Sequence, residues 1–142
     1  MKVKQLSIFL ENKVGRLLET TEVLAGQNIN IRAMSIAETS DFGIVRLIVE
    51  NVDNACKLLK MHDFTVEITE VIAVEVDDRP GQLARVLRTL QDNNLNIEYC
   101  YAFVERNQDK AVIILRMENI DKSIDTLVNN EIKVLTQEEL FK

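Results

Sequence analysis

Two short segments of the sequence hold residue types that can bind a small anion. They read E-N-K-V-G-R-L at residues 11–17 and D-D-R-P-G-Q-L at residues 77–83. In each, a glycine stands where an amphipathic helix is predicted to begin. The first N–H groups of a helix lack partners within it and carry partial positive charge, so they can receive a carboxylate. The alternative interpretation is a simple helix start with a glycine turn.

A second pair of segments follows the two predicted helices. They read N-I-N-I at residues 28–31 and N-L-N-I at residues 94–97. Asn28 and Asn94 are interpreted as turn residues, because asparagine tolerates the left-handed backbone conformation. Asn30 and Asn96 open a predicted strand, where their amides can meet the amino or carboxylate group of a ligand. These asparagines are therefore candidate ligand-binding residues.

Both motifs belong to a repeat that covers most of the chain. The spacing is 66 residues, as between Gly15 and Gly81, and becomes 68 where VENVDNACKLL at 49–59 matches MENIDKSIDTL at 117–127. The two extra residues are expected in a surface hairpin at 105–110, where insertions are tolerated. With no Pro/Gly/Ser-rich linker between the copies, we predict two closely packed domains, residues 1–70 and 71–142.

The hydrophobic pattern predicts the same order of elements in each copy. Alternating apolar residues predict strands, and apolar residues three and four apart predict helices. The order is β-α-β-β-α-β, twice. Split β-α-β crossovers give a four-stranded antiparallel sheet with both helices on one face. The fold class is therefore α+β, with two ferredoxin-like units side by side.

Composition limits the function. The net charge of −6 at pH 7 argues against nucleic acid and against anionic membranes. The sequence shows no transmembrane segment and no signal peptide, so a cytoplasmic location is expected. Two cysteines and one histidine, His62, predict no disulfide framework, metal site, cofactor or catalytic triad. We expect His62 to cap the end of a helix.

In its glycine and asparagine segments each copy resembles the ACT domain, a small regulatory module that binds amino acids in many enzymes of amino-acid metabolism. The resemblance covers residues 3–70 and 71–136. It rests on the acidic-x-x-x-Gly-x-Leu segment, the amphipathic helix after it, and the N-[IL]-N-I start of the next strand. It implies a ligand at the interface of two units. One unit supplies backbone N–H groups from its glycine loop, and the other supplies side chains from its second strand.

The resemblance implies two sets of ligand-binding positions in this sequence. One implied site consists of Asn12, Val14, Gly15, Arg16 and Leu17 with Asn96 and Ile97. The other consists of Asp78, Pro80, Gly81, Gln82 and Leu83 with Asn30 and Ile31. The amide of Asn12 can donate to a carboxylate, whereas ionised Asp78 can only accept, for example from an α-ammonium group. The two sites are therefore not expected to be equivalent.

The leading hypothesis is a non-catalytic regulatory protein that binds a free amino acid between its two ACT domains and signals to a partner enzyme of amino-acid metabolism. A homodimer is expected, since apolar residues are predicted on exposed sheet faces. One alternative is a structural or interaction subunit without a ligand. Another is a small acylphosphatase-like enzyme on the same fold, for which only one copy has a Gly-Arg pair. An RNA-binding sheet is disfavoured, because the first copy lacks aromatic residues on the relevant strand.

Overall fold

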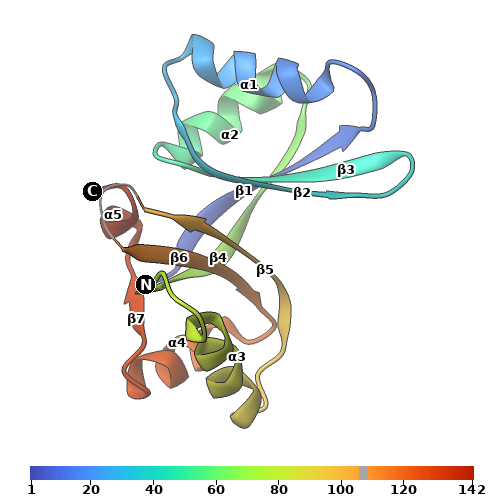
Figure 1. The fold of residues 1–142 in the computed structure, drawn as a ribbon. Coiled ribbons are helices and arrows are strands. Elements are labelled where there is room, and N and C mark those ends of the chain that lie inside the picture. The colour runs from blue at the N-terminus through green and yellow to red at the C-terminus, as the bar shows by residue number, and fades with distance from the viewer. Residues whose placement is uncertain (106–108) are drawn as a thin grey trace. The chain divides into compact units, whose positions relative to one another are not determined.

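The computed structural model describes residues 1–105 and 109–142. The centre of the turn predicted to hold two extra residues, 106–108, lies outside the described residues. In chain order the elements are β1 (Val3–Glu11), α1 (Arg16–Gly26), β2 (Ile31–Glu38), β3 (Phe42–Val49), α2 (Val52–Met61), β4 (Thr65–Asp77), α3 (Gln82–Asp92), β5 (Ile97–Val104), β6 (Lys110–Met117), α4 (Ile120–Asn129), β7 (Lys133–Leu135) and α5 (Gln137–Leu140). Figure 1 labels them. The predicted β-α-β-β-α-β order is confirmed for both copies.

The chain divides into two compact units. The first unit is Lys4–Thr69, and the second unit is Glu70–Lys142 together with Met1–Val3. Ion pairs from Lys2 to Glu70 (3.8 Å) and to Asp121 (3.1 Å) hold the N-terminal residues to the second unit. The domain boundaries 1–70 and 71–142 stay a prediction about which parts fold and act independently.

One strand, β4, contributes to both units. The predicted order places one strand at the end of the first copy and another at the start of the second, but T-V-E-I-T-E-V-I-A-V-E-V-D forms a single strand of 13 residues. The reason is local: the stretch contains no glycine, proline or asparagine that would favour a turn. Each unit therefore takes one end of the same strand.

Each unit has the strand order expected for a ferredoxin-like sheet. In the first unit the order is β2-β3-β1-β4, and in the second it is β5-β6-β4-β7. The pairings of β1 with β3, β2 with β3, β4 with β6 and β5 with β6 are antiparallel. Strands β3 and β6 lie inside their sheets, as their apolar residues on both faces predict. The second strand of each copy, β2 or β5, lies at an edge.

The two helices of each unit pack on one face of its sheet, as Figure 1 shows for each unit. In the first unit, alternate residues of β1 and β3 form a core with Leu24 of α1 and Leu59 of α2. The second unit repeats this with Leu90 of α3 and Leu127 of α4. All four leucines are fully buried. Each β-α-β-β-α-β copy therefore has its own hydrophobic core.

The four long helices end in the same way, with a left-handed residue two positions beyond the last helical residue. These residues are Asn28, Asp63, Asn94 and Glu131, with φ from 55° to 63°. The next N–H donates back to the helix, as from Ile29 to the carbonyl of Leu24 (3.0 Å). Asn28 and Asn94 are thus confirmed as turn residues. Gly26 is the last residue of α1 and, unlike Asn28, does not have a positive φ.

Replacing the buried leucine of α3 should destabilise the protein. Leu90→Ala removes methyl groups from a fully buried position and leaves a cavity, which costs about 2–5 kcal/mol of unfolding free energy. Urea denaturation of the full chain should show the loss. Val128→Ala is the matched control, because Val128 in α4 is 45% exposed and its truncation should change the midpoint little. Equal midpoints for the two variants would contradict the assignment of Leu90 to the core.

Candidate functional site

The two glycine loops have the same backbone conformation. Gly15 and Gly81 are the N-cap residues of α1 and α3, and each has φ 91° and ψ −13°. A side chain at this φ is strained, which explains the choice of glycine. A Cβ atom placed on either glycine would meet no atom within 4 Å. The backbone conformation requires glycine, and the surface beside the glycine is open.

The first helical turns behind these glycines leave amide groups without backbone acceptors. The earliest bonds to the caps are from Glu19 N–H to the Gly15 carbonyl (2.9 Å) and from Arg85 N–H to the Gly81 carbonyl (3.0 Å). Within the described residues, the N–H groups of Leu17 and Leu18, and of Leu83 and Ala84, have no such partner, and neither cap offers a side-chain bond. These unpartnered N–H groups are the hydrogen-bond donors that the predicted anion binding requires.

Each loop is tied to the hairpin of its own unit. The N–H of Asn12 donates to the carbonyl of Asp41, and that of Asp78 to the carbonyl of Asp109, both at 2.9 Å. The side-chain amide of Asn12 also donates to the carbonyl of Ser40 at 3.4 Å. Because an amide nitrogen has two hydrogens, Asn12 keeps one for a ligand. Its role thus includes anchoring the loop.

The guanidinium of Arg16 has two partners within its own unit. Its guanidinium donates to Glu19 at 2.7 Å and lies over the ring of Phe64, 4.7 Å from the centroid. Phe64 follows α2, so this contact joins α1 to the end of α2. Arg16 consequently stabilises the packing of the two helices.

Lysines beside the loops lower the pKa values of two carboxyl groups. A hydrogen bond from Lys13 holds the pKa of Glu11 below its usual value, and a hydrogen bond from Lys110 does the same for Asp77. Lys110 in turn has a raised pKa because of Asp77. Asp77 and Lys110 are also partners in the register of β4 and β6. Both ion pairs therefore fix the strand end from which the loop departs.

The asparagines Asn30 and Asn96 lie at the opposite end of the sheet from the loop of the same unit. In the first unit the end of β1 pairs with the start of β3 (Glu11 with Phe42), whereas the start of β2 pairs with its end (Ile31 with Val49). The second unit repeats this arrangement. Eight residues of strand separate the two ends, roughly 20 Å or more. One unit alone therefore cannot bring its own loop and its own asparagine together.

A cavity of ≈ 410 Å³ in the second unit includes two of the predicted residues. Asn96 and Ile97 line it at the start of β5, together with Leu87, Gln91, Asn94 and Leu95. Sequence reasoning missed Leu87 and Gln91. Their spacing of four residues on α3 was the available signal, because residues four apart lie on the same face of a helix. The corresponding residues of α1 are Thr21 and Ala25, so the two copies differ here.

The aromatic residues of β5 lie on the sheet face opposite the helices. Tyr101 pairs with Ile114 and Phe103 with Val112, while Cys100 between them pairs with the core residue Leu115. Tyr99, Tyr101 and Phe103 are half-buried.

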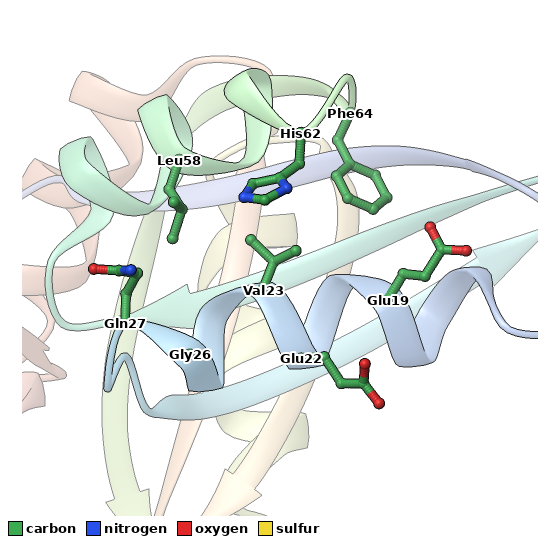
Figure 2. Close-up of a pocket in the computed structure, with 8 residues that line it drawn as sticks. All are labelled: Glu19, Glu22, Val23, Gly26, Gln27, Leu58, His62 and Phe64. Carbon is green, nitrogen blue, oxygen red and sulfur yellow. The ribbon is translucent and has the colours of Figure 1, made fainter.

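A groove that the sequence did not predict runs between α1 and α2. Its volume is ≈ 480 Å³, and it is lined by Glu19, Glu22, Val23, Gly26, Gln27, Leu58, His62 and Phe64. Figure 2 shows Val23 and Glu19 of α1 pointing toward His62 and Phe64 at the end of α2, whereas the side chain of Glu22 points away from α2. His62 is the C-cap residue of α2, as expected. This groove is separate from the loops and from the strand starts.

The described residues also bear on metal and membrane binding. No group of three His, Cys, Asp or Glu side chains among them is placed to hold a metal ion. No helix in the described part of the chain has the length and apolar character needed to cross a membrane.

Comparison with known proteins gives a family and a set of similar folds. The profile of a family described as an ACT domain pair matches residues 1–142. A crystal structure of protein BT0572 from Bacteroides thetaiotaomicron is 46% identical, with a TM-score of 0.94, over 100% of this chain and 97% of that one. A comparison with curated protein sequences found no match.

Two more distant structures share the fold. The ligand-free regulatory subunit of aspartate kinase from Thermus thermophilus is 12% identical with a TM-score of 0.63, over 89% of this chain and 91% of that one. Aspartate kinase from Clostridium acetobutylicum is 13% identical with a TM-score of 0.57, over 90% of this chain and 32% of that one. At these identities the likeness shows the fold alone.

The two loop glycines should resist replacement, in contrast to the helical glycine Gly26. Gly15→Ala and Gly81→Ala each force a Cβ into the left-handed region and should cost about 1–2 kcal/mol of stability. Gly26→Ala should stabilise by up to ~1 kcal/mol, because Gly26 ends α1 and a Cβ there meets no atom within 4 Å. Thermal unfolding of the three variants measures this contrast. Gains at all three positions would show that the loop conformation is wrong.

The ion pair between Asp77 and Lys110 should make stability depend on pH. The pKa of Asp77 is lowered in the folded state, so its contribution is present above the ordinary Asp pKa and is lost as pH falls through the lowered value. Lys110→Gln should therefore unfold at lower urea than the parent at pH 7, and the two should converge in acid. Lys122→Gln, which removes another exposed lysine, is the control. A gap that persists at low pH would contradict this assignment.

Proposed function

The chain belongs to the family of ACT domain pairs, and from this premise we propose that it is a non-catalytic regulatory protein that binds a free amino acid. When it has bound the amino acid, the protein signals to an enzyme of amino-acid metabolism. The observation that carries the proposal is the pair of glycine loops, which share φ 91° and ψ −13° and precede helix turns with unpartnered N–H groups. Such donors suit the α-carboxylate that every free amino acid carries.

The asparagine side chains supply the second half of each proposed site. An amide oxygen of Asn96 or Asn30 accepts from an α-ammonium group, and its NH₂ donates to a carboxylate. Because a loop and an asparagine of the same unit lie at opposite sheet ends, each site combines residues of two different units. The first proposed site joins Asn12, Val14, Gly15, Arg16 and Leu17 to Asn96 and Ile97. The second joins Asp78, Pro80, Gly81, Gln82 and Leu83 to Asn30 and Ile31.

Of these two sites, we propose that the one with Asn96 and Ile97 is the principal one. Its strand start lines a cavity, with Leu87 as an apolar wall and Gln91 as an additional polar group. A small ligand is held best where apolar walls surround a few polar anchors. The charge balance also favours it, because its loop offers neutral Asn12 where the other offers Asp78.

The remaining parts of the proposal concern the setting of the protein. We propose a cytoplasmic homodimer that acts on its partner without chemistry of its own. A ligand bound between two units changes how freely the units move relative to each other. This change couples ligand binding to a second site by a free energy of typically ~1–3 kcal/mol. A structural subunit without a ligand is the alternative that the following experiment addresses.

A thermal-shift panel of the twenty amino acids tests the proposal. One member, or a few chemically related ones, should raise the unfolding temperature of the full chain. At about 100-fold excess over the dissociation constant the gain is about 2.7 kcal/mol, which corresponds to ~5–10 °C for a protein of this size. A flat panel would reject amino-acid binding and favour the structural subunit.

Substitutions at the two asparagines locate the site. Asn96→Ala should weaken binding of the identified amino acid by ~10- to 100-fold, the value of a hydrogen bond to a charged group. Asn30→Ala is the matched control, because it removes the same amide from the other copy. Gly15→Asn and Gly81→Asn then test the loops, since asparagine tolerates a positive φ and places a side chain in the open space. Binding that depends on Asn30 and Gly81 alone would move the principal site to the second set.

A further inference from the structure

The outer helix faces of the two units carry opposite charges at corresponding positions. Glu19 and Glu22 of α1 correspond to Arg85 and Arg88 of α3. All four side chains are exposed in the single chain. The buried leucines of the same helices, Leu24 and Leu90, are identical. The repeat therefore keeps its core and reverses the charge of one surface.

The acidic surface includes a groove that has room for a side chain. The space between α1 and α2 measures ≈ 480 Å³ and is lined by Glu19, Val23, His62 and Phe64. Glu22 also borders it, although its side chain points away from α2 (Figure 2). Glu19 already accepts a hydrogen bond from Arg16 through one oxygen. Its other oxygen and the carboxylate of Glu22 remain able to accept further bonds. The groove thus combines negative charge, an apolar wall and an aromatic ring.

The basic surface lies at the equivalent place in the second unit. The guanidinium of Arg85 reaches across to the carbonyl of Asn130 at the end of α4, at 3.5 Å. Asn130 corresponds to His62, which closes the groove of the first unit. Arg88 lies one helical turn further along α3 and is exposed. Arg85 and Arg88 therefore occupy the positions that the carboxylates occupy over the other groove.

We propose that the α1–α2 groove of one molecule binds the α3 arginines of a second copy of the same chain. Arginine offers a planar set of donors that fits a carboxylate, and it packs its stem on apolar and aromatic surface. A chain with net charge −6 repels its own copies in general, so association needs local complementarity of this kind. Each copy carries both the groove and the arginines, so two copies together hold two complementary pairs of surfaces.

This inference rests on the homodimer of the proposed function and on no other part of it. It adds the surface through which the two copies meet. The groove lining and the α3 arginines share no residue with the glycine loops or with the cavity at Asn96. Amino-acid binding measured on the same variants will therefore separate a failure of this inference from a failure of the proposed function.

Exchange of one charge pair between positions tests the surface. Glu22→Arg and Arg88→Glu are made singly and together in the full chain, and the dissociation constant is measured by sedimentation equilibrium at low salt. Each single variant should dissociate at least ~10-fold more readily than the parent, as expected for loss of a close charge pair. The double variant should regain the parent value. An equal mixture of the two single variants should associate as well, because both contacts in the mixed dimer are then complementary.

Lys57→Glu is the matched control for Arg88→Glu, because it changes the net charge equally but lines a different groove, beside Met61 and Ile68. It should leave association unchanged. Thermal unfolding confirms that every variant is folded. A dimer that none of the substitutions affects overturns the proposed surface and leaves the homodimer, whereas a parent chain that stays monomeric overturns both. Equal weakening by Lys57→Glu also overturns the surface.

Discussion

The geometry of one sheet constrains the rest of this protein. In a β-α-β-β-α-β unit the loop after the first strand and the start of the second strand lie at opposite ends, as the pairings of Glu11 with Phe42 and Ile31 with Val49 demonstrate. Loop amides and strand-start amides therefore cannot meet within one unit. In the proposed function, a ligand that uses both therefore contacts two different units.

Backbone conformation explains which residues the two copies share. Gly15 and Gly81 have the same positive φ, and so do Asn28 and Asn94 at the other ends of their helices. These positions set the direction in which a loop or strand leaves the helix, and few residue types adopt them without strain. Their recurrence follows from local geometry, whether or not a ligand is present. The feature that favours ligand binding is therefore the set of unpartnered N–H groups behind the glycines.

The sequence was sufficient for the fold because periodicity and repetition agreed in both copies. Alternation at Leu6, Ile8 and Leu10 predicted a strand, and the same face packs in the first core. The continuity of β4 was missed, because a repeat encourages a boundary where the backbone has none. Helix α5 was missed as well, although its capping box, Thr136 with Glu139, is visible in the sequence. The candidate loops were located by spacing alone.

Surface features were harder to predict because they depend on which side chains meet across elements. The engagement of Arg16 with Phe64 joins residues far apart in the chain, and no spacing rule reveals it. The reversal from Glu19 and Glu22 to Arg85 and Arg88 is visible in the aligned copies, but its meaning requires the groove beside it. The core constrains leucine to remain leucine, whereas exposed helix positions accept either charge. Two copies with equal cores were therefore free to acquire complementary surfaces, and complementary surfaces on one chain favour association with another copy of that chain.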